Sequence, residues 1–244
     1  MNIVFPEYHN KIIQAAIKKA QDIEAIEAKT LEDACEKLKN READAIIAGI
    51  DCPTRDVVLA CKNHLEMTSH TFSSCFLLEK PGSKTYILAD AGVTKNPTKD
   101  QLVEIIKQTY KTAKKLLKDE PKIAVLSFST KGSARDDSID KINQAIAEIP
   151  AEIIIDGELQ LDAAINPEIA AKKCPSSPLK GAANVLITPD LNSGNILYKA
   201  FEQIGGYTAA GPILQGFNFP ISDLSRGSTT EDVLLVIDCI KKLA

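Results

Sequence analysis

The sequence predicts an α/β protein built on a mostly parallel sheet. Strand-like segments alternate along the chain with segments whose apolar residues recur at helical spacing. Two runs, Ala43–Ile50 and Ile123–Phe128, are almost continuously apolar, as is typical of parallel strands buried on both faces. Hydrophobic residues make up 44% and charged residues 25% of the 244 residues, which is ordinary for a globular protein. We therefore expect a packed core and no disordered tract.

Turn and cap signals place the elements of the first half. Thr30 and Thr98-x-x-Gln101 have the composition of helix N-caps, and Lys80-Pro-Gly-Ser83 is a turn signal that predicts a β-hairpin. The expected elements are a strand Asn2–Phe5, a helix His9–Ala20, a strand Ile23–Ala28, a helix from Thr30 to about Asn40, the strand Ala43–Ile50, a helix through Leu65, the strands Phe72–Glu79 and Lys84–Asp90, and a long helix after Thr98.

The second half continues the alternation. The expected elements are the strand Ile123–Phe128, a helix Asp136–Ile149, a strand Glu152–Ile155, a helix Gln160–Ala171, a strand Ala183–Ile187, a helix Gly194–Gln203, a strand Ala209–Leu214 and a helix Thr229–Leu243. Ligands of open α/β sheets bind beyond the carboxyl ends of the strands. The loops after Ile123–Phe128, Ala183–Ile187 and Ala209–Leu214 are therefore expected to gather around a ligand.

Composition excludes several classes of function. The net charge is −4 and there is no basic block, so no nucleic-acid partner is expected. The N-terminus lacks the pattern of a secretory signal, and no apolar run reaches transmembrane length, so no membrane partner is expected. The six cysteines form no CxxC motif, which favours reduced thiols in a cytoplasmic protein. With three histidines, neither a histidine-based metal site nor a Ser-His-Asp triad is expected.

The segment Gly216–Asp232 predicts an anion site. Ser228-x-x-Glu231 reads as a capping box, so Ser228 is expected to open the last helix. Arg226 lies two residues before that helix N-terminus, whose free N–H groups and dipole favour an anion, and its planar guanidinium suits phosphate or carboxylate. Ser225 adds a hydroxyl and Asp232 a carboxylate, although an acidic residue in a first helical turn is also explained by the helix dipole alone. Spacing by itself names no reaction.

Four collinear stretches resemble the phosphate acetyltransferase and phosphate butyryltransferase family, the phosphotransacetylases. The resemblance extends from about Ala43 to the C-terminus. The stretches are Leu126–Ala134 (LSFSTKGSA), Asp156–Asp162 (DGELQLD), Ala183–Lys199 (ANVLITPDLNSGNILYK), and the pair Gly211–Gly216 (GPILQG) with Ser222–Gly227 (SDLSRG).

The resemblance implies an architecture of two three-layer α/β/α domains, similar to isocitrate and isopropylmalate dehydrogenases. Mapped onto this chain, residues 1–117 plus 207–244 form the first domain and residues 118–206 the second, with the active-site cleft between them. The resemblance also implies a homodimer, no tightly bound cofactor and no metal, with CoA and acetyl-CoA as substrates.

The reaction implied by the resemblance is the reversible conversion of acetyl-CoA and phosphate into acetyl phosphate and CoA, a step of acetate metabolism, by direct transfer in a ternary complex. In this reading Arg226 holds phosphate, Ser225 donates a hydrogen bond to the tetrahedral transition state, and Asp232 is the base for the CoA thiol. The residues expected to bind substrate are Arg55, Ser129, Thr130, Lys131, Gly132, Asn195, Lys199 and Gln215.

Two departures from the family leave alternatives open. The segment before Ala43–Ile50 is much shorter than in typical members, so part of the first domain is expected to be missing. Leu59 stands where the family has an arginine, while Arg55 lies one helical turn earlier and hence on the same face. One alternative is a non-catalytic module that binds acyl-CoA, like the related regulatory domain of some malic enzymes. The other is a phosphate butyryltransferase with a different acyl group.

Overall fold

A computed structural model describes all residues from Met1 to Ala244. The chain divides into two compact units: the first contains Met1–Phe72 and Ala209–Ala244, and the second contains Ser73–Thr208. The sequence-derived boundary near residue 207 lies close to this division. Residues 73–117 were expected in the first domain, whereas here they pack with the second unit, because a hairpin and a long helix in this segment contact later strands and helices. The cleft expected between the domains stays a prediction.

The first unit contains a five-stranded sheet, mostly parallel as predicted. Its strand order is β2 (Glu24–Glu27), β1 (Asn2–Phe5), β3 (Ala45–Ala48), β10 (Ile221–Asp223) and β9 (Thr208–Gln215). The first four strands are parallel, with Ile46 opposite Ile221, and β9 runs antiparallel to β10. Because β9 is reversed, it ends where β3 and β10 begin.

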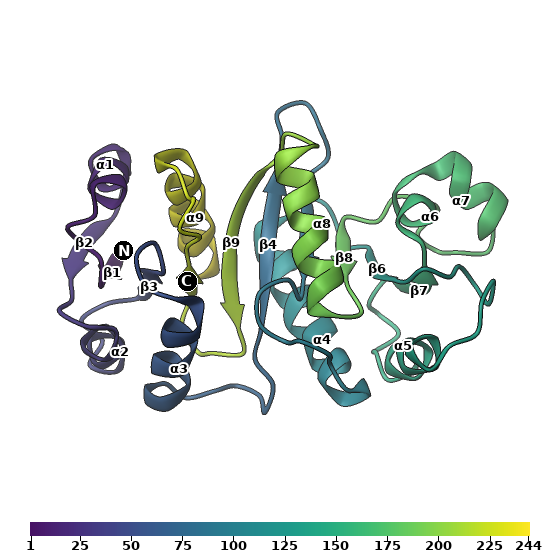
Figure 1. Cartoon of the computed structure of the whole chain (residues 1–244), viewed down its shortest axis with the longest axis horizontal. Helices are drawn as coiled ribbons and strands as arrows, with labels where there is room; N and C mark the ends of the chain where they lie inside the picture. The colour runs from purple at the N-terminus through teal and green to yellow at the C-terminus, as the bar shows by residue number, and fades with distance from the viewer. The chain divides into compact units, whose positions relative to one another are not determined.

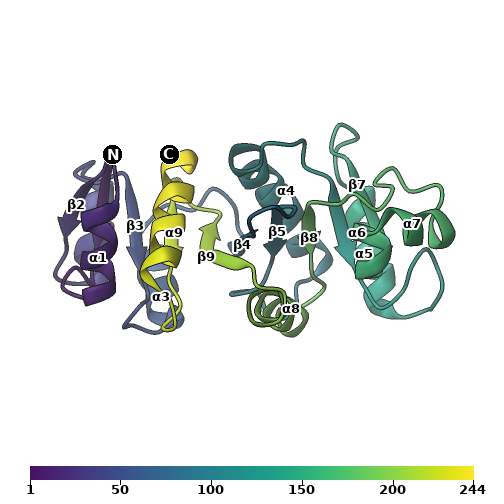
Figure 2. The same cartoon turned by 90° about the horizontal axis from the view of Figure 1, so that it is seen from above.

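Two pairs of helices cover this sheet. Helices α1 (Lys11–Lys19) and α9 (Thr230–Leu243) pack against each other, and α2 (Leu31–Lys39) packs against α3 (Thr54–His64). Figures 1 and 2 show the two pairs on opposite faces of the strands. The apolar side chains that meet the sheet, such as Ile13 and Leu38, are fully buried. Thr30 caps α2 as predicted, since its side chain accepts a hydrogen bond from Asp33 N at 3.1 Å.

The second unit holds the other five strands. Their order is β4 (Ser73–Glu79), β5 (Tyr86–Ala89), β8 (Val185–Ile187), β6 (Ile123–Leu126) and β7 (Ile155–Leu159). The predicted hairpin is confirmed, because β4 and β5 pair antiparallel, and the remaining pairs are parallel. The fold class, a mostly parallel α/β arrangement, is therefore confirmed in both units.

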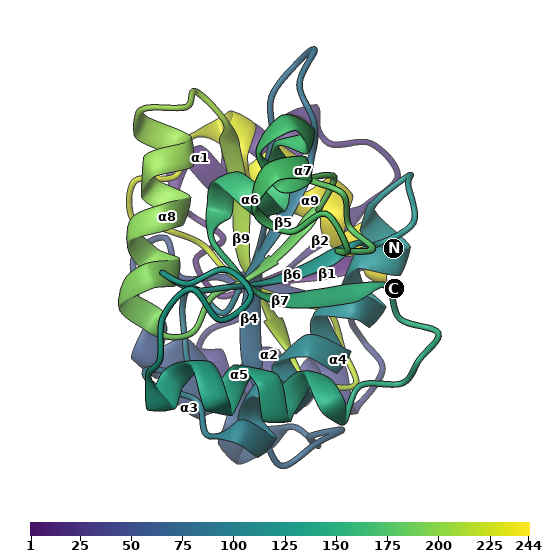
Figure 3. The same cartoon turned by 90° about the vertical axis from the view of Figure 1, so that its right-hand side faces the viewer.

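Helices cover both faces of the second sheet as well. Helix α4 (Lys99–Leu116) packs against α5 (Asp137–Ala147), while α6 (Leu161–Ile165), α7 (Pro167–Lys173) and α8 (Leu191–Gln203) lie on the other side (Figure 3). The capping box predicted at Thr98 and Gln101 is present at the start of α4. A stacked ring pair, Phe76 on β4 and Tyr198 on α8, fixes α8 on the sheet with ring centroids 4.2 Å apart.

Some elements differ from the sequence prediction. The strand expected at Glu152–Ile155 is wrong: β7 occupies Ile155–Leu159. The motif residues Asp156 and Glu158 are thus buried within a strand. The predicted helix Gln160–Ala171 is broken into α6 and α7 at Asn166, because a residue before proline disfavours helical backbone.

The chain near the signature segment also differs. No strand is predicted between Ala209–Leu214 and the last helix, but β10 lies there. This three-residue strand runs next to β9 in the opposite direction. The segment Ser225–Ser228 therefore follows β10, not β9. The prediction that Ser228 opens the last helix is wrong by one residue, since Thr229 is the N-cap of α9.

Candidate active site

In the first unit, two loops emerge at the same edge of the sheet. Strands β3 and β10 are parallel neighbours, so the loop from β3 to α3 and the loop from β10 to α9 leave at their common carboxyl end. The first loop leads to Arg55, which lies in the first turn of α3 and is exposed. The second contains Ser225 and Arg226, both exposed. The fold therefore brings two arginines and a hydroxyl to one edge, after β3 and β10, whereas the sequence placed the signature segment after the strand Ala209–Leu214.

The loop after β3 is held by a residue that the sequence analysis missed. The carboxylate of Glu7 accepts backbone hydrogen bonds from Gly49 and Ile50 on Oε2, at 2.8 and 3.3 Å, and from Asp51 and Cys52 on Oε1, both at 2.8 Å. Four consecutive N–H groups aimed at one carboxylate form a rigid turn ahead of α3. No periodic signal marks Glu7, because its partners lie more than 40 residues away in the sequence.

The loop after β10 is a tight turn with a free guanidinium. Ser228 N donates to Ser225 O at 2.9 Å, and Gly227 N donates to Ser225 Oγ at 3.3 Å. The hydroxyl of Ser225 keeps its own proton for another acceptor. The structure gives Arg226 no carboxylate partner, so its donors are available to an anion.

Asp232 has a structural role in the helix cap. Its Oδ2 accepts hydrogen bonds from Thr229 N at 2.7 Å and from Thr229 Oγ1 at 2.8 Å, and Thr229 Oγ1 accepts from Asp232 N at 3.2 Å. The capping box therefore joins Thr229 and Asp232, in place of the predicted Ser228 and Glu231. Both pairs fit the sequence pattern, and only the turn formed by Ser225 and Ser228 decides between them. These hydrogen bonds leave the other oxygen, Oδ1, without an assigned partner.

A buried carboxylate lies just before the signature turn. Asp223 ends β10 with 0% exposure, and neither carboxylate oxygen has a hydrogen-bond partner of good geometry. Burial, with repulsion from Glu7, raises its pKa to about 6, although the nearby Thr54 hydroxyl opposes that shift. Gly49 makes room for it: a Cβ there would lie 2.1 Å from Asp223 Oδ1. Burial and Glu7 likewise raise the pKa of Cys52 to about 12, so Cys52 is no thiolate at neutral pH.

In the second unit, Glu158 on β7 organises the loop after β6. Its Oε1 accepts hydrogen bonds from Ser129 Oγ at 2.9 Å and from Gly132 N at 2.7 Å. Burial opposes ionisation of Glu158, but these hydrogen bonds and nearby Lys131 hold the pKa of Glu158 below its usual range. Ser129 is fully buried. Two of the residues expected to bind substrate thus hold the loop in place.

The neighbouring residues of the loop are also engaged within the unit. The hydroxyl of Thr130 accepts a hydrogen bond from Gln160 N at 3.0 Å. The ammonium group of Lys131 forms an ion pair with Asp156 and donates to Gly157 O at 2.8 Å. The positive charge of Lys131 is therefore already compensated. A role in binding substrate stays a prediction for all four loop residues, but their observed contacts are structural.

A cavity of about 650 Å³ lies at the carboxyl ends of β6 and β8. Its walls are largely apolar and include Phe128 and Ile196, which are 62% and 69% exposed. Other lining residues come from the ends of both strands and from α8, namely Leu126, Ser127, Thr188, Pro189, Asp190, Asn192, Ser193, Leu197 and Ala200. Asn195 and Lys199 also lie on α8 but do not line the cavity. The sequence analysis missed Phe128 and Ser127 as candidate contacts, although both belong to the motif Leu126–Ala134.

Two further sequence predictions concern the first unit. Gln215, at the end of β9, is only 5% exposed, so little of its side chain is accessible. Leu59, which replaces the arginine of the family, is 40% exposed on α3, one turn after Arg55. An apolar side chain thus faces solvent where a positive charge was expected.

No group of three or more histidine, cysteine, aspartate or glutamate side chains is arranged to hold a metal ion. No helix is both long enough and apolar enough to span a membrane. All six cysteines are free thiols.

Comparison with known proteins identifies relatives over almost the whole chain. A sequence profile described as phosphate acetyl/butaryl transferase matches residues 1–239. A phosphate acetyltransferase of Clostridium acetobutylicum is 50% identical over 154 residues, which are 62% of this chain and 46% of that protein. The chain spans between 46% and 65% of the length of three such curated relatives.

Solved structures agree with the sequence comparison. A phosphotransacetylase from Streptococcus pyogenes matches with a TM-score of 0.89 and 30% identity, covering 100% of this chain and 93% of that one. A 4-hydroxythreonine-4-phosphate dehydrogenase from Klebsiella pneumoniae matches with a TM-score of 0.54 and 14% identity, covering 86% of this chain and 68% of that one. At that identity the second likeness concerns the fold alone, and it agrees with the dehydrogenase-like architecture expected from the sequence.

Proposed function

Because the chain belongs to the phosphate acetyl/butaryl transferase family, we propose that it interconverts acetyl-CoA plus phosphate with acetyl phosphate plus CoA, in the cytoplasm. One observation supports this most directly. Ser225 and Arg226 are exposed at the sheet edge where α3 also presents Arg55, and neither arginine has a carboxylate partner. Such a site suits a phosphate dianion, which guanidinium groups bind bidentately.

The proposed chemistry is direct acyl transfer. The sulfur of CoA attacks the carbonyl carbon of acetyl phosphate, the bond from that carbon to the bridging oxygen breaks, and phosphate leaves. Arg226 binds the phosphate and stabilises negative charge on the carbonyl oxygen, while Ser225 Oγ donates to that oxygen. Cys52 stays protonated at neutral pH, since its pKa is raised to about 12, so a covalent acyl-cysteine intermediate is disfavoured.

We propose that Asp232 accepts the proton of the CoA thiol. Its Oδ2 is occupied by the cap, and Oδ1 carries no assigned hydrogen bond. The cap orients the carboxylate, because two hydrogen bonds from Thr229 fix the plane of the side chain. An oriented carboxylate with one free oxygen is suited to general-base catalysis. The structural and catalytic roles of Asp232 therefore use different oxygens and are compatible.

For the second unit, we propose that the apolar cavity at β6 and β8 receives part of CoA. Phe128 and Ile196 provide exposed apolar surface for the pantetheine chain, and Lys141 on its wall supplies a positive charge for a phosphate group. In this proposal Ser129, Thr130, Lys131 and Gly132 support the shape of the cavity through Glu158 and Asp156. They act by positioning the segment that contains Phe128.

One observation favours a second candidate function. Leu59 leaves an exposed apolar side chain where a second phosphate-binding arginine is expected, which would suit a module that binds acyl-CoA without turning it over. Acyl-chain preference is a separate matter, because a butyryl group would need only a wider pocket. We also propose a homodimer, as expected of the family.

The test is an assay of CoA consumption with acetyl phosphate. We expect Arg226→Ala to lower kcat by orders of magnitude, with little rescue in Arg226→Lys because the bidentate geometry is lost. Asp232→Asn keeps a cap acceptor and should lower kcat by about 10²–10⁴-fold, with a defect that shrinks at high pH as free thiolate accumulates. Lys18→Ala on α1 and Asp238→Asn on α9 are the matched controls, since both residues are exposed.

Three results would change the proposed function. Unchanged kcat in Arg226→Ala would reject the phosphate site. Unchanged kcat in Asp232→Asn, with only a lower Tm, would show that Asp232 stabilises the helix cap and is not the catalytic base. Saturable binding of acetyl-CoA by the wild-type chain without any turnover would support the non-catalytic alternative.

A further inference from the structure

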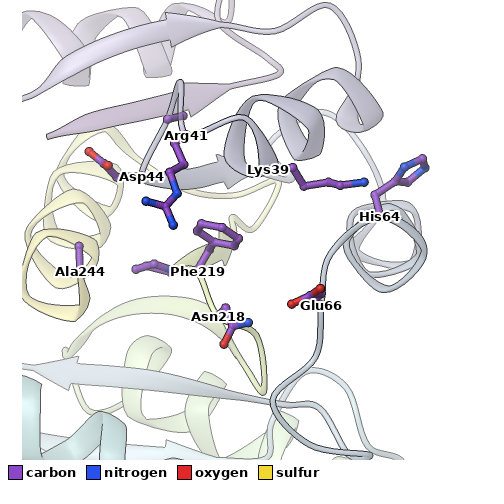
Figure 4. A pocket seen from close by; sticks show the side chains of 10 residues that line it. Lys39, Arg41, Asp44, His64, Glu66, Asn218, Phe219 and Ala244 are labelled. Carbon is purple, nitrogen blue, oxygen red and sulfur yellow. The ribbon is translucent and has the colours of Figure 1, made fainter.

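A second cavity lies in the first unit, at the end of the sheet opposite to Ser225 and Arg226. It has a volume of about 870 Å³ and is bounded by the residues that precede β3 and β10, by the end of α2 and by the end of α3. Figure 4 shows the side chains around it. Because β3 and β10 are parallel, this cavity and the proposed phosphate site are at opposite ends of the same two strands.

Two cationic side chains enter this cavity without a partner. Figure 4 shows the Arg41 guanidinium next to the Phe219 ring, and the Lys39 ammonium reaching toward His64. Neighbouring Lys37 is held between Asp33 and Glu42, at 3.7 and 3.6 Å. Neither Lys39 nor Arg41 has such a carboxylate.

Two carboxylates also lie on the wall, and neither forms an ion pair with these cations. Asp44 Oδ2 accepts a hydrogen bond from Asn2 N at 2.7 Å, and in Figure 4 its carboxylate points away from Arg41. Glu66 lies on the other wall, beside Asn218. The wall therefore carries charges of both signs, and Arg41 and Lys39 are the two groups on it that can bind an anion.

The backbone at Arg41 is strained for an arginine. Arg41 has φ +60° and follows the C-cap Asn40 of α2. Arg41 N donates to Leu38 O at 3.1 Å and Glu42 N donates to Lys37 O at 2.9 Å, which is the hydrogen-bond pattern of a Schellman motif. Glycine is the usual residue at this position because it adopts positive φ without strain. Arg41 can therefore be replaced by glycine without loss of the turn, which allows its side chain to be tested separately from its backbone.

Phe219 gives the cavity a flat apolar surface next to the cations. It lies between β9 and β10, is partly exposed, and is flanked by the amide of Asn218. A ligand that suits all these groups carries a phosphate and a planar ring with polar edges. We propose that this cavity binds a nucleoside monophosphate, with its phosphate on Arg41 and Lys39 and its base on Phe219, independently of the acyl-transfer site.

The experiment is isothermal titration of the full chain with AMP, with and without excess CoA. We expect one saturable site whose Kd is the same with and without CoA. Adenosine and inorganic phosphate should each bind at least about 10-fold more weakly than AMP, because each lacks one half of the contacts. Displacement of AMP by CoA together with unchanged AMP affinity in Arg41→Gly would place AMP at the acyl-transfer site and overturn the proposal. So would the absence of saturation at millimolar AMP, or equal binding of phosphate alone.

Arg41→Gly separates a binding role from a structural one. Glycine suits φ +60°, so the variant should fold with a Tm equal to or above that of the wild type, yet bind AMP at least about 10-fold more weakly. The matched control is Lys180→Gly in the second unit, which removes an exposed cation from a position with φ +48° and should leave AMP binding unchanged. Unchanged affinity in Arg41→Gly, or the same loss in both variants, would refute the assignment.

Discussion

Replacing Asp223 by asparagine should stabilise the protein at neutral pH. The carboxylate is 0% exposed at the end of β10, and neither of its oxygens has a hydrogen-bond partner of good geometry. A buried charge without a partner is unfavourable, and burial accordingly raises the pKa of Asp223 from its ordinary 3.8 to about 6. Asparagine has nearly the same shape and carries no charge, so it removes this penalty.

The size of the effect follows from the pKa. The difference between 3.8 and about 6 corresponds to about 3 kcal/mol of unfolding free energy. The folded state has the higher pKa, so between pH 4 and pH 6 it binds the proton more readily than the unfolded state. The wild type therefore loses up to about 3 kcal/mol as the pH rises through this window. Any cost of burying the amide is the same at every pH, so the slope is the diagnostic quantity.

The assay is urea unfolding followed by circular dichroism, from pH 4.5 to pH 8. We expect the free energy of Asp223→Asn minus that of the wild type to increase with pH, most steeply below pH 6, and to level off above pH 7. Asp238→Asn, which removes an exposed carboxylate from α9, is the control and should show no such increase. A difference that stays constant with pH, or one that follows the control, would refute the reasoning.

Two further predictions concern the second unit and the assembly. Glu158→Gln should lower the unfolding free energy of the second unit by about 1–3 kcal/mol, because the buried hydroxyl of Ser129 and the backbone N–H of Gly132 lose a charged acceptor. Faster amide exchange at Gly132 would report this, whereas Glu168→Gln, an exposed change on α7, should not alter it. Light scattering at micromolar concentration should find a homodimer, and a monomeric mass would contradict that proposal.

The sequence predicted the elements whose causes are local. The caps at Thr30 and Thr98 depend on residues three positions away, and both were found where the pattern placed them. Strand β7 was misplaced because Asp156 and Glu158 look like loop residues. Their burial depends on Lys131 and Ser129, about 25 to 29 residues earlier, and no periodicity reveals such a pairing. A strand that buries carboxylates is recognisable only once their partners are known.

The same limit applies to the candidate site. The location of Arg226 just before a helix start could be predicted from the local sequence, whereas β10, which leads to it, could not, because a three-residue strand leaves no periodic signal. The direction in which the Ser129 and Lys131 side chains point could not be predicted. A loop of small polar residues has the same sequence pattern whether its side chains face a ligand or a buried carboxylate. For Asp232 the sequence left open which of two adjacent residues is the N-cap of the last helix. Two adjacent hydroxyls fitted the pattern, and the turn from Ser225 to Ser228 selected Thr229.

Glu7 and Glu158 connect these observations, because each holds a loop that leaves the carboxyl end of a parallel strand. Glu7 binds four consecutive backbone N–H groups after β3, and Glu158 binds a hydroxyl and an N–H group after β6. Backbone donors that would otherwise attract an anion are thus already satisfied. The arginines at the first edge, Arg55 and Arg226, are left as the donors that an incoming phosphate can use. Loops fixed in advance and guanidinium groups left unpaired are what electrostatic stabilisation of a transition state requires, since little reorganisation remains at the moment of reaction.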